Sequence, residues 1–158
     1  MVGFDVRNMR ENDLEGLIKL NNNINCSKFD SLFQENKNKV IVAQLNDDII
    51  GYVKFKILKN ITYKNIIFID EILVDEMYRG LGVGYQLMVE AEKGIKDYKD
   101  SSLVVINNRY LGVEEVFYDR QGFNLNSNRF YEKNIVFNIL WFKGMSKKHS
   151  FRLCLISI

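Results

Sequence analysis

Three of the chain's ten glycines, Gly80, Gly82 and Gly84, fall within five residues at the entrance to a segment with helical spacing of apolar side chains. Glycine permits close backbone approach and unusual dihedral angles, and a helix N-terminus offers unpaired N–H groups and a partial positive charge. Together these features form a site for an anion such as phosphate. The helix that would complete this site is expected from Leu81 to about Lys96.

The spacing of the glycines separates the classes of phosphate-binding turn. A P-loop requires a Lys-Ser/Thr pair after its last glycine, but Tyr85 and Gln86 follow Gly84 here, which excludes that class. A dinucleotide fingerprint requires Gly-x-Gly-x-x-Gly at the start of a β-α-β unit. The present Gly-x-Gly-x-Gly follows several strands of antiparallel pattern and fits that fingerprint poorly.

The elements before the turn are expected to be mainly strands. Asn12 is expected to cap an early helix, with Glu15 reaching back as in a capping box. The other expected elements are a strand at Val2–Val6, a second helical stretch at Ser27–Asn36, a hairpin of Lys39–Leu45 and Ile49–Leu58 around Asn46-Asp47-Asp48, and an apolar, central strand at Ile66–Val74.

After the glycine turn the pattern alternates between strand and helix. The expected elements are a strand at Ser102–Ile106, a helix at Val113–Arg120 that stops at Gly122, and a terminal hairpin of Phe123–Tyr131 and Ile135–Lys143 joined by Glu132-Lys133-Asn134. The apolar stretch Phe151–Ile158 is expected to form an extra edge strand or a tail.

The bulk properties describe one soluble domain, residues 1–158, with residues 145–158 as the possible extra strand or tail. A net charge of +2 does not predict nucleic-acid binding, and no apolar stretch has the length of a membrane span, so a cytoplasmic location is expected. Cys26, Cys154 and His149 show no metal-ligand spacing, and no metal is expected.

The sequence Val74-Asp75-Glu76-Met77-Tyr78-Arg79-Gly80-Leu81-Gly82-Val83-Gly84 resembles the acetyl-CoA motif of the GNAT superfamily of N-acetyltransferases, Arg/Gln-x-x-Gly-x-Gly/Ala. It lacks the proline that often follows the strand in that family. Further landmarks of the same family, in the same order, run from Val6-Arg7 to Gly122-Phe123. The resemblance covers roughly residues 4 to 144.

The resemblance implies an α/β (α+β) fold with a mixed, mostly antiparallel central sheet of about six or seven strands and about four flanking helices. It also implies acetyl-CoA as co-substrate. The backbone of Ile72–Val74 would line the pantetheine arm and help to hold the developing oxyanion, and the turn would donate N–H groups to the pyrophosphate. The implied cofactor-binding residues are Ile72, Leu73, Val74, Arg79, Gly80, Leu81, Gly82, Val83, Gly84, Tyr85, Asn107 and Asn108.

Direct attack by an amine on the thioester needs a base for the amine and an acid for the departing thiolate. The resemblance places Tyr118 where many relatives have the acid, although a packed aromatic beside Phe117 is the alternative. Asp70 and Glu71 lie on the central strand as candidate bases, and strand alternation is expected to send them to opposite faces. Glu71 is our choice, with binding of a substrate cation or pairing with a lysine as the alternative.

The leading hypothesis is therefore an acetyl-CoA-dependent N-acetyltransferase that acts on a small-molecule amine or on a protein or peptide amine. The alternatives are a non-catalytic acyl-CoA-binding or interaction module with the same fold, and an enzyme that uses another acyl chain or another phosphate cofactor. A homodimer is possible through the terminal strands, which could pair between chains. The acceptor amine is not predictable from these residues.

Overall fold

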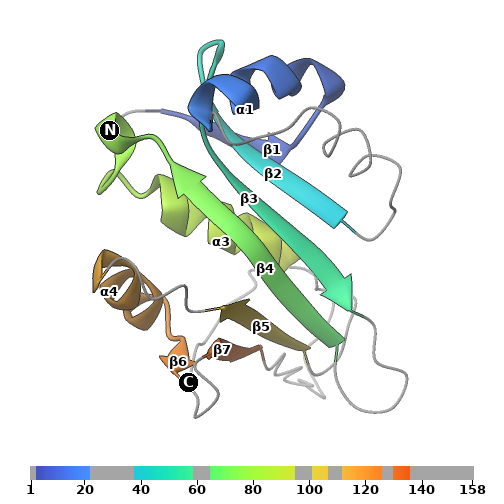
Figure 1. The fold of residues 1–158 in the computed structure, drawn as a ribbon, viewed down its shortest axis with the longest axis vertical. Coiled ribbons are helices and arrows are strands. Elements are labelled where there is room, and N and C mark those ends of the chain that lie inside the picture. The colour runs from blue at the N-terminus through green and yellow to red at the C-terminus, as the bar shows by residue number, and fades with distance from the viewer. Residues whose placement is uncertain are drawn as a thin grey trace, which may run out of the picture.

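In the part of the chain that the structure describes, seven strands form one sheet with helices on both of its faces (Figure 1). The computed structural model describes residues 3–21, 38–58, 65–94, 101–106, 112–125 and 130–135. The strands are β1 Asp5–Asn8, β2 Asn38–Leu45, β3 Asp48–Leu58, β4 Asn65–Val74, β5 Ser101–Ile106, β6 Asn124–Leu125 and β7 Phe130–Ile135. The α-helices of this part of the chain are α1 Leu14–Leu20, α3 Val83–Lys93 and α4 Gly112–Arg120. Short 3-10 turns lie at Glu11–Asp13 and Glu76–Tyr78.

The sheet has the strand order β1-β2-β3-β4-β5-β7-β6 and is antiparallel except for the parallel pair β4 and β5. This confirms the expected mixed, mostly antiparallel sheet. The described residues contain fewer helices than expected, and the helix expected at Ser27–Asn36 lies outside them. Within the described ranges, no helix is both long and apolar enough to cross a membrane.

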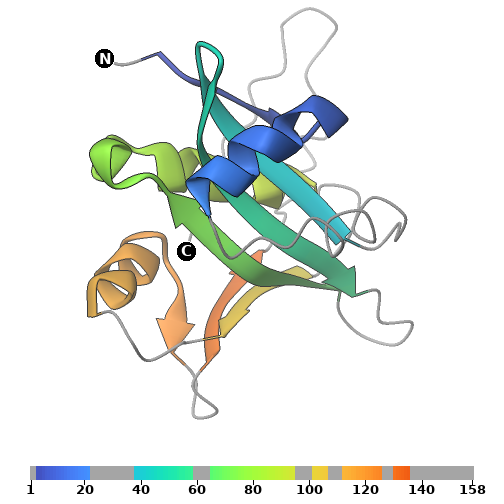
Figure 2. The ribbon, with the colours of Figure 1, turned by 45° about the horizontal axis from the view of Figure 1, so that its top comes forward.

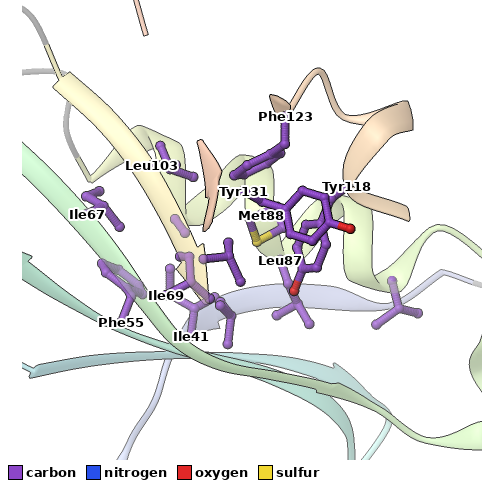
Figure 3. Packing of buried hydrophobic residues seen from close by; sticks show 14 of the residues in the cluster. Ile41, Phe55, Ile67, Ile69, Leu87, Met88, Leu103, Tyr118, Phe123 and Tyr131 are labelled. Atoms are coloured by element: carbon purple, nitrogen blue, oxygen red, sulfur yellow. The ribbon is translucent and has the colours of Figure 1, made fainter. Parts of the chain in front are cut away.

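Apolar side chains on the two faces of the sheet form two separate clusters. The larger cluster joins α3 and α4 to one face and includes Phe55, Ile67, Leu87, Met88 and Leu103 (Figure 3). The smaller cluster joins α1 to the other face through Leu17, Val42, Ile49 and Tyr52. Figure 2 shows α1 and α3 on opposite sides of the sheet. Each face of β3 and β4 therefore carries a distinct set of side chains.

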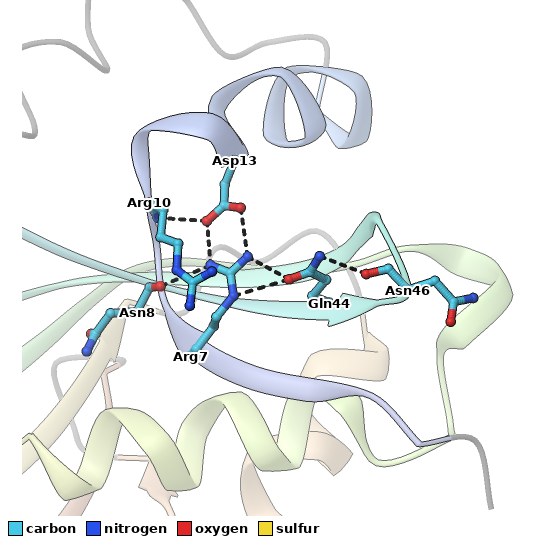
Figure 4. Close-up of polar contacts among 6 residues, drawn as sticks. All are labelled: Arg7, Asn8, Arg10, Asp13, Gln44 and Asn46. Carbon is cyan, nitrogen blue, oxygen red and sulfur yellow. Dashed lines mark hydrogen bonds and ion pairs between the residues drawn. The ribbon is translucent and has the colours of Figure 1, made fainter.

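The start of α1 is fixed by a polar clamp, shown in Figure 4. Two guanidinium nitrogens of Arg7 donate to the two carboxylate oxygens of Asp13 at 2.6 and 2.8 Å, and Arg7 also donates to Gln44 on β2. Asp13 in addition accepts the backbone N–H of Arg10 at 2.7 Å. The expected cap by Asn12 is wrong, because Asn12 lies inside the 3-10 turn and Asp13 is the residue that reaches back.

Helix α4 ends as its glycine predicts. Gly122 has a φ of +79°, and the N–H of Phe123 reaches back to the carbonyl of Tyr118 at 3.1 Å while the N–H of Gly122 reaches that of Asp119 at 3.0 Å. These two bonds form a Schellman motif. The Tyr118 and Phe123 rings, 5.5 Å apart, supply the apolar contact that accompanies it. This termination fixes the direction of the Tyr118 side chain.

The ends of several expected elements differ from the observed ones. β1 begins later than Val2–Val6, and α3 is shorter than Leu81–Lys96. The expected turn Glu132-Lys133-Asn134 is wrong, because these residues lie within β7, between β5 and β6. Their polar side chains have partners: Ser102 on β5 donates to Glu132 and Asn134, and Lys133 pairs with Glu92 on α3. Residues 136–143 and Phe151–Ile158 lie outside the described residues.

Candidate functional site

The glycine turn has the backbone conformation that glycine permits. Gly80 has a φ of +78° and Gly82 a φ of +87°, a region that residues with a Cβ seldom adopt. A Cβ at either position would meet no atom within 4 Å, so the space beside the backbone is open. Glycine is therefore favoured here by the backbone φ angle and not by steric crowding. Gly82 is the N-cap of α3, whose first N–H groups have no partner within the helix. The turn can therefore accept an anion.

Arg79 connects this turn to the end of β4. Its Nε donates to the carbonyl of Val74 at 3.1 Å, and its Nη1 lies 3.3 Å from Oε1 of Glu76. The guanidinium is still more than half exposed, so it can contribute positive charge at the edge of the turn. The carboxylate of Asp75 accepts the N–H of Met77 and caps the intervening 3-10 turn. These contacts among Val74, Asp75, Glu76, Met77 and Arg79 hold the turn against the strand.

Among the described residues, the edge of β4 that faces β5 is paired over only part of its length. The two strands pair from Asn65 with Ser101 to Ile69 with Val105, whereas β4 continues to Val74 with β3 as its partner. Figure 2 shows β4 and β5 diverging in this direction. The backbone of Ile72, Leu73 and Val74 therefore faces the gap between the strands and can hydrogen-bond an extended ligand there.

Helix α4 lies against the glycine turn. A Cβ on Gly84 would come within 3.1 Å of the Phe117 ring and 3.7 Å of the Val74 side chain, so the absence of a side chain allows the turn, β4 and α4 to meet. Tyr118, the next residue, is only 4% exposed. Its ring stacks on Tyr131 at 4.9 Å and contacts Phe117 at 5.2 Å. The Tyr118 ring is therefore part of the packed core, independently of any catalytic role of its hydroxyl.

Asp70 and Glu71 lie on the same face of the sheet, contrary to the expectation from strand alternation. Glu71 is opposite Lys54, but the next pair is Ile69 with Phe55, so Asp70 is an extra residue in β4. This β-bulge shifts the alternation by one residue. Glu71 shares the face of its partner Lys54, and the Asp70 carboxylate lies beside Lys54 and Lys56 on that same face.

The two carboxylates have different surroundings. One oxygen of Asp70 lies 3.3 Å from the Lys56 ammonium and 3.8 Å from that of Lys54, and the Asp70 side chain is 17% exposed. Glu71 is exposed and accepts a hydrogen bond from the side-chain amide of Asn21 at 3.2 Å. Two cations thus neutralise Asp70, whereas Glu71 contacts a neutral donor.

Two residues near Glu71 were not predicted from the sequence. Asn21, at the C-terminal end of α1, also donates to the hydroxyl of Tyr52 at 2.8 Å. Burial raises the pKa of Tyr52, and the charge and hydrogen bonding of Glu71 raise it further, against the lowering effect of the Asn21 hydrogen bond. No local pattern marks these two residues, because Tyr52 lies 31 positions and Glu71 lies 50 positions from Asn21 in the chain. The sequence cue is one hydroxyl within an otherwise apolar strand segment.

The remaining expected site residues, Asn107 and Asn108, lie outside the described residues. Leu81 and Tyr85 are about half exposed at the turn, and Val83 is buried beneath it. Among the side chains that the structure describes, no group of three or more His, Cys, Asp or Glu residues is placed to hold a metal ion.

Comparison with protein families identifies this architecture. The family model for the acetyltransferase (GNAT) domain matches residues 36–134, which include β4, the glycine turn and α4. The chain belongs to the GNAT acetyltransferase family. A comparison with curated protein sequences gives no match.

Solved structures of low sequence identity share the GNAT fold. Glucosamine-6-phosphate N-acetyltransferase from Arabidopsis thaliana is 17% identical, with a TM-score of 0.65 over 79% of this chain and 94% of that chain. NAA60 from A. thaliana, in complex with a bisubstrate analogue, is 20% identical, with a TM-score of 0.62 over 86% and 99%. PaiA N-acetyltransferase from Thermoplasma acidophilum, in complex with coenzyme A, is 18% identical, with a TM-score of 0.58 over 85% and 99%.

The residues of this GNAT domain have the chemistry that coenzyme A would require. The open backbone at Gly80 and Gly82 suits a pyrophosphate, because an added Cβ would meet no protein atom and close approach of a ligand is possible. The unpaired edge of β4 at Ile72–Val74 suits the amide groups of a pantetheine arm. These two parts are joined by Arg79.

Proposed function

We propose that this GNAT domain is an acetyl-CoA-dependent N-acetyltransferase that transfers an acetyl group to a primary amine. One observation carries the proposal: an anion-accepting turn, an unpaired strand edge and an exposed carboxylate, Glu71, all occur within one β4–α3 unit. Family membership supports acyl transfer. The proposal of an amine acceptor rests on Glu71, because an amine must lose a proton before or as it attacks the thioester, and Glu71 can take that proton.

The cofactor would be held mainly by backbone. Gly80–Tyr85 would donate N–H groups to the pyrophosphate, with Arg79 adding charge at the edge. Ile72–Val74 would bind the pantetheine arm and polarise the carbonyl that it carries. When bound, acetyl-CoA supplies the activated acetyl group as a thioester. Asn107 and Asn108 complete the proposed cofactor set.

Glu71 is the proposed base and Tyr118 the proposed acid. Glu71 is preferred to Asp70 because two lysines already neutralise Asp70, whereas Glu71 is exposed and keeps its negative charge toward the acceptor. Such a charge can bind an ammonium group and take its proton, directly or through water. Tyr118 follows Phe117, which contacts Gly84 of the turn, so Tyr118 lies on the helix that borders the cofactor. Its hydroxyl would return a proton to the departing thiolate.

The test is release of free coenzyme A thiol from acetyl-CoA in the presence of single primary amines. The panel contains glucosamine 6-phosphate, an aminoglycoside, spermidine, a peptide with a free N-terminus and a peptide with an internal lysine. Amine-dependent release, with an acetylated amine in the mass spectrum, supports the proposal. Tight binding of acetyl-CoA, with no thiol released from it in the presence of any amine of the panel, would instead support the non-catalytic module.

A further inference from the structure

Tyr52 carries a hydroxyl group into an apolar cluster. Its side chain is fully buried among Leu17, Val42 and Ile49 and packs against Leu73 of β4. A phenylalanine would fill this space without bringing a polar atom, and burying a hydroxyl has a cost unless it is hydrogen-bonded. The hydroxyl of Tyr52 accepts a hydrogen bond from Asn21 at 2.8 Å. Packing alone therefore does not require this residue type.

Asn21 connects Tyr52 to Glu71. Its side-chain amide nitrogen donates to Tyr52 and also, at 3.2 Å, to a carboxylate oxygen of Glu71. A carboxylate only accepts, so the orientation of the Asn21 amide is fixed with its nitrogen toward both oxygens. The backbone N–H of Asn21 bonds to Leu17, which lies in the same cluster as Tyr52. Asn21 and Tyr52 thus lie at the end of α1 and in the middle of β3, respectively.

The hydroxyl of Tyr52 accepts a hydrogen bond from Asn21 and still has its own O–H to donate. Glu71 is the acidic group whose charge and hydrogen bonding raise the pKa of this hydroxyl. Lys54 is opposite Glu71 on β3, but it contacts Asp70. Asn21, the described side chain that donates to Glu71, is neutral and holds the carboxylate without cancelling its charge.

We propose that Tyr52 and Asn21 are positioning residues that hold the Glu71 carboxylate at the β4 bulge for the acceptor amine. This inference rests on the proposed N-acetyltransferase function, in which Glu71 binds and deprotonates the amine. Asp70, one residue away, serves in contrast as the counter-ion of Lys54 and Lys56. The hydrogen bonds among Tyr52, Asn21 and Glu71 thus distinguish Glu71, the carboxylate that would act on the amine, from Asp70, the carboxylate that pairs with lysines.

A double-mutant cycle tests this role. Tyr52→Phe removes the hydroxyl and keeps the ring, and we expect a fall in kcat/KM for the amine of about tenfold with the Kd of acetyl-CoA unchanged. Asn21→Leu should act in the same direction. In a Glu71→Gln background, Tyr52→Phe should have little further effect, because Tyr52 acts through Glu71. An equal fall in both backgrounds would show that Tyr52 only packs and would overturn the proposal.

A spectroscopic measurement separates the contact from catalysis. In protein labelled with carbon-13 at the tyrosine hydroxyl-bearing carbon, the Tyr52 signal is identified as the one lost in Tyr52→Phe. Glu71→Gln should shift that signal, whereas Glu90→Gln, a charge removal on α3, should leave it in place. An unchanged Tyr52 signal in Glu71→Gln would overturn the proposal even if the enzyme is active. A shifted signal in a chain that acetylates no amine would retain the contact but overturn the proposed function and this role with it.

Discussion

The glycine turn and the β4 bulge are adjacent in the chain and differ in what defines them. The turn depends on backbone conformation within a few consecutive residues, with Gly80 and Gly82 in the left-handed region. The bulge presents side chains whose partners come from α1 and β3, far away in sequence. A site made of backbone can be recognised from local residue types, whereas a site made of side chains needs the register of the sheet.

The proposed function assigns different tasks to the two regions, cofactor binding to the turn and deprotonation of the acceptor amine to the bulge. Substitutions in the turn should change cofactor binding and leave the acceptor side intact, while substitutions at the bulge should do the reverse.

Gly82→Val should abolish acetyl-CoA binding. A β-branched residue at a φ of +87° is strained, and relief of that strain would move the N–H groups at the start of α3. Loss of two charge-assisted hydrogen bonds would weaken affinity at least about 100-fold. Isothermal titration with acetyl-CoA measures the change.

Gly122→Val is the matched control, because Gly122 has a φ of +79° and similar open space around its missing Cβ. It should destabilise the protein comparably, as judged by thermal unfolding, but bind acetyl-CoA far better than Gly82→Val. Equal affinities in the two variants would contradict a cofactor role for the turn.

Glu71→Gln should lower kcat/KM for the amine about 100-fold, because general-base catalysis contributes effects of at least this order. The Kd of acetyl-CoA should stay within about twofold of the wild-type value, since the backbone that would hold the cofactor is unchanged. Thiol release under varied amine concentration gives kcat/KM for the amine, and isothermal titration gives the Kd of acetyl-CoA.

Asp70→Asn is the control for the loss of an adjacent carboxylate. It should lower thermal stability, because it leaves Lys54 and Lys56 without their shared counter-ion, yet change kcat/KM less than about threefold. A larger kinetic effect for Asp70→Asn than for Glu71→Gln would reverse the assignment of the base.

Tyr118→Phe should reduce kcat about 30-fold without weakening acetyl-CoA binding, because a proton donor is lost while the packed ring remains. Pre-steady-state measurement of thiol release reports the chemical step. Wild-type turnover in this variant would leave Tyr118 with only its packing against Tyr131, Phe117 and Phe123.

Asp13→Asn should lower the free energy of unfolding by about 2 kcal/mol at neutral pH, because hydrogen bonds to a charged group are lost. The Arg7 hydrogen bonds hold the pKa of Asp13 below its ordinary value. A lowered pKa gives stability that is present above the unfolded value of about 4 and is lost as pH falls through the folded pKa. Urea unfolding across pH should therefore show the two proteins converging in acid, with acetyl-CoA affinity unaffected near pH 7.

Local patterns predicted much of the fold. The Asn46-Asp47 turn between β2 and β3, the Gly122 stop of α4 and the helix after Gly82 each depend on residues within one or two turns of chain. The turn expected at Glu132-Lys133-Asn134 was wrong because partners on β5 and α3 satisfy these polar residues inside a strand. The shared face of Asp70 and Glu71 was unpredictable for a related reason: a bulge is a property of two strands together.

The β4 bulge has a consequence for how this domain can change by mutation. Substitution at position 70 replaces a side chain but keeps the count of residues, so the bulge can persist and Glu71 keeps its face. Loss of Asp70 would restore regular alternation with β3, because Ile69 pairs with Phe55 and Glu71 with Lys54 on either side of it, so the strand residues that follow would keep their faces. The face of Glu71 thus depends on its pairing with Lys54, which neither exchange nor deletion at position 70 would change.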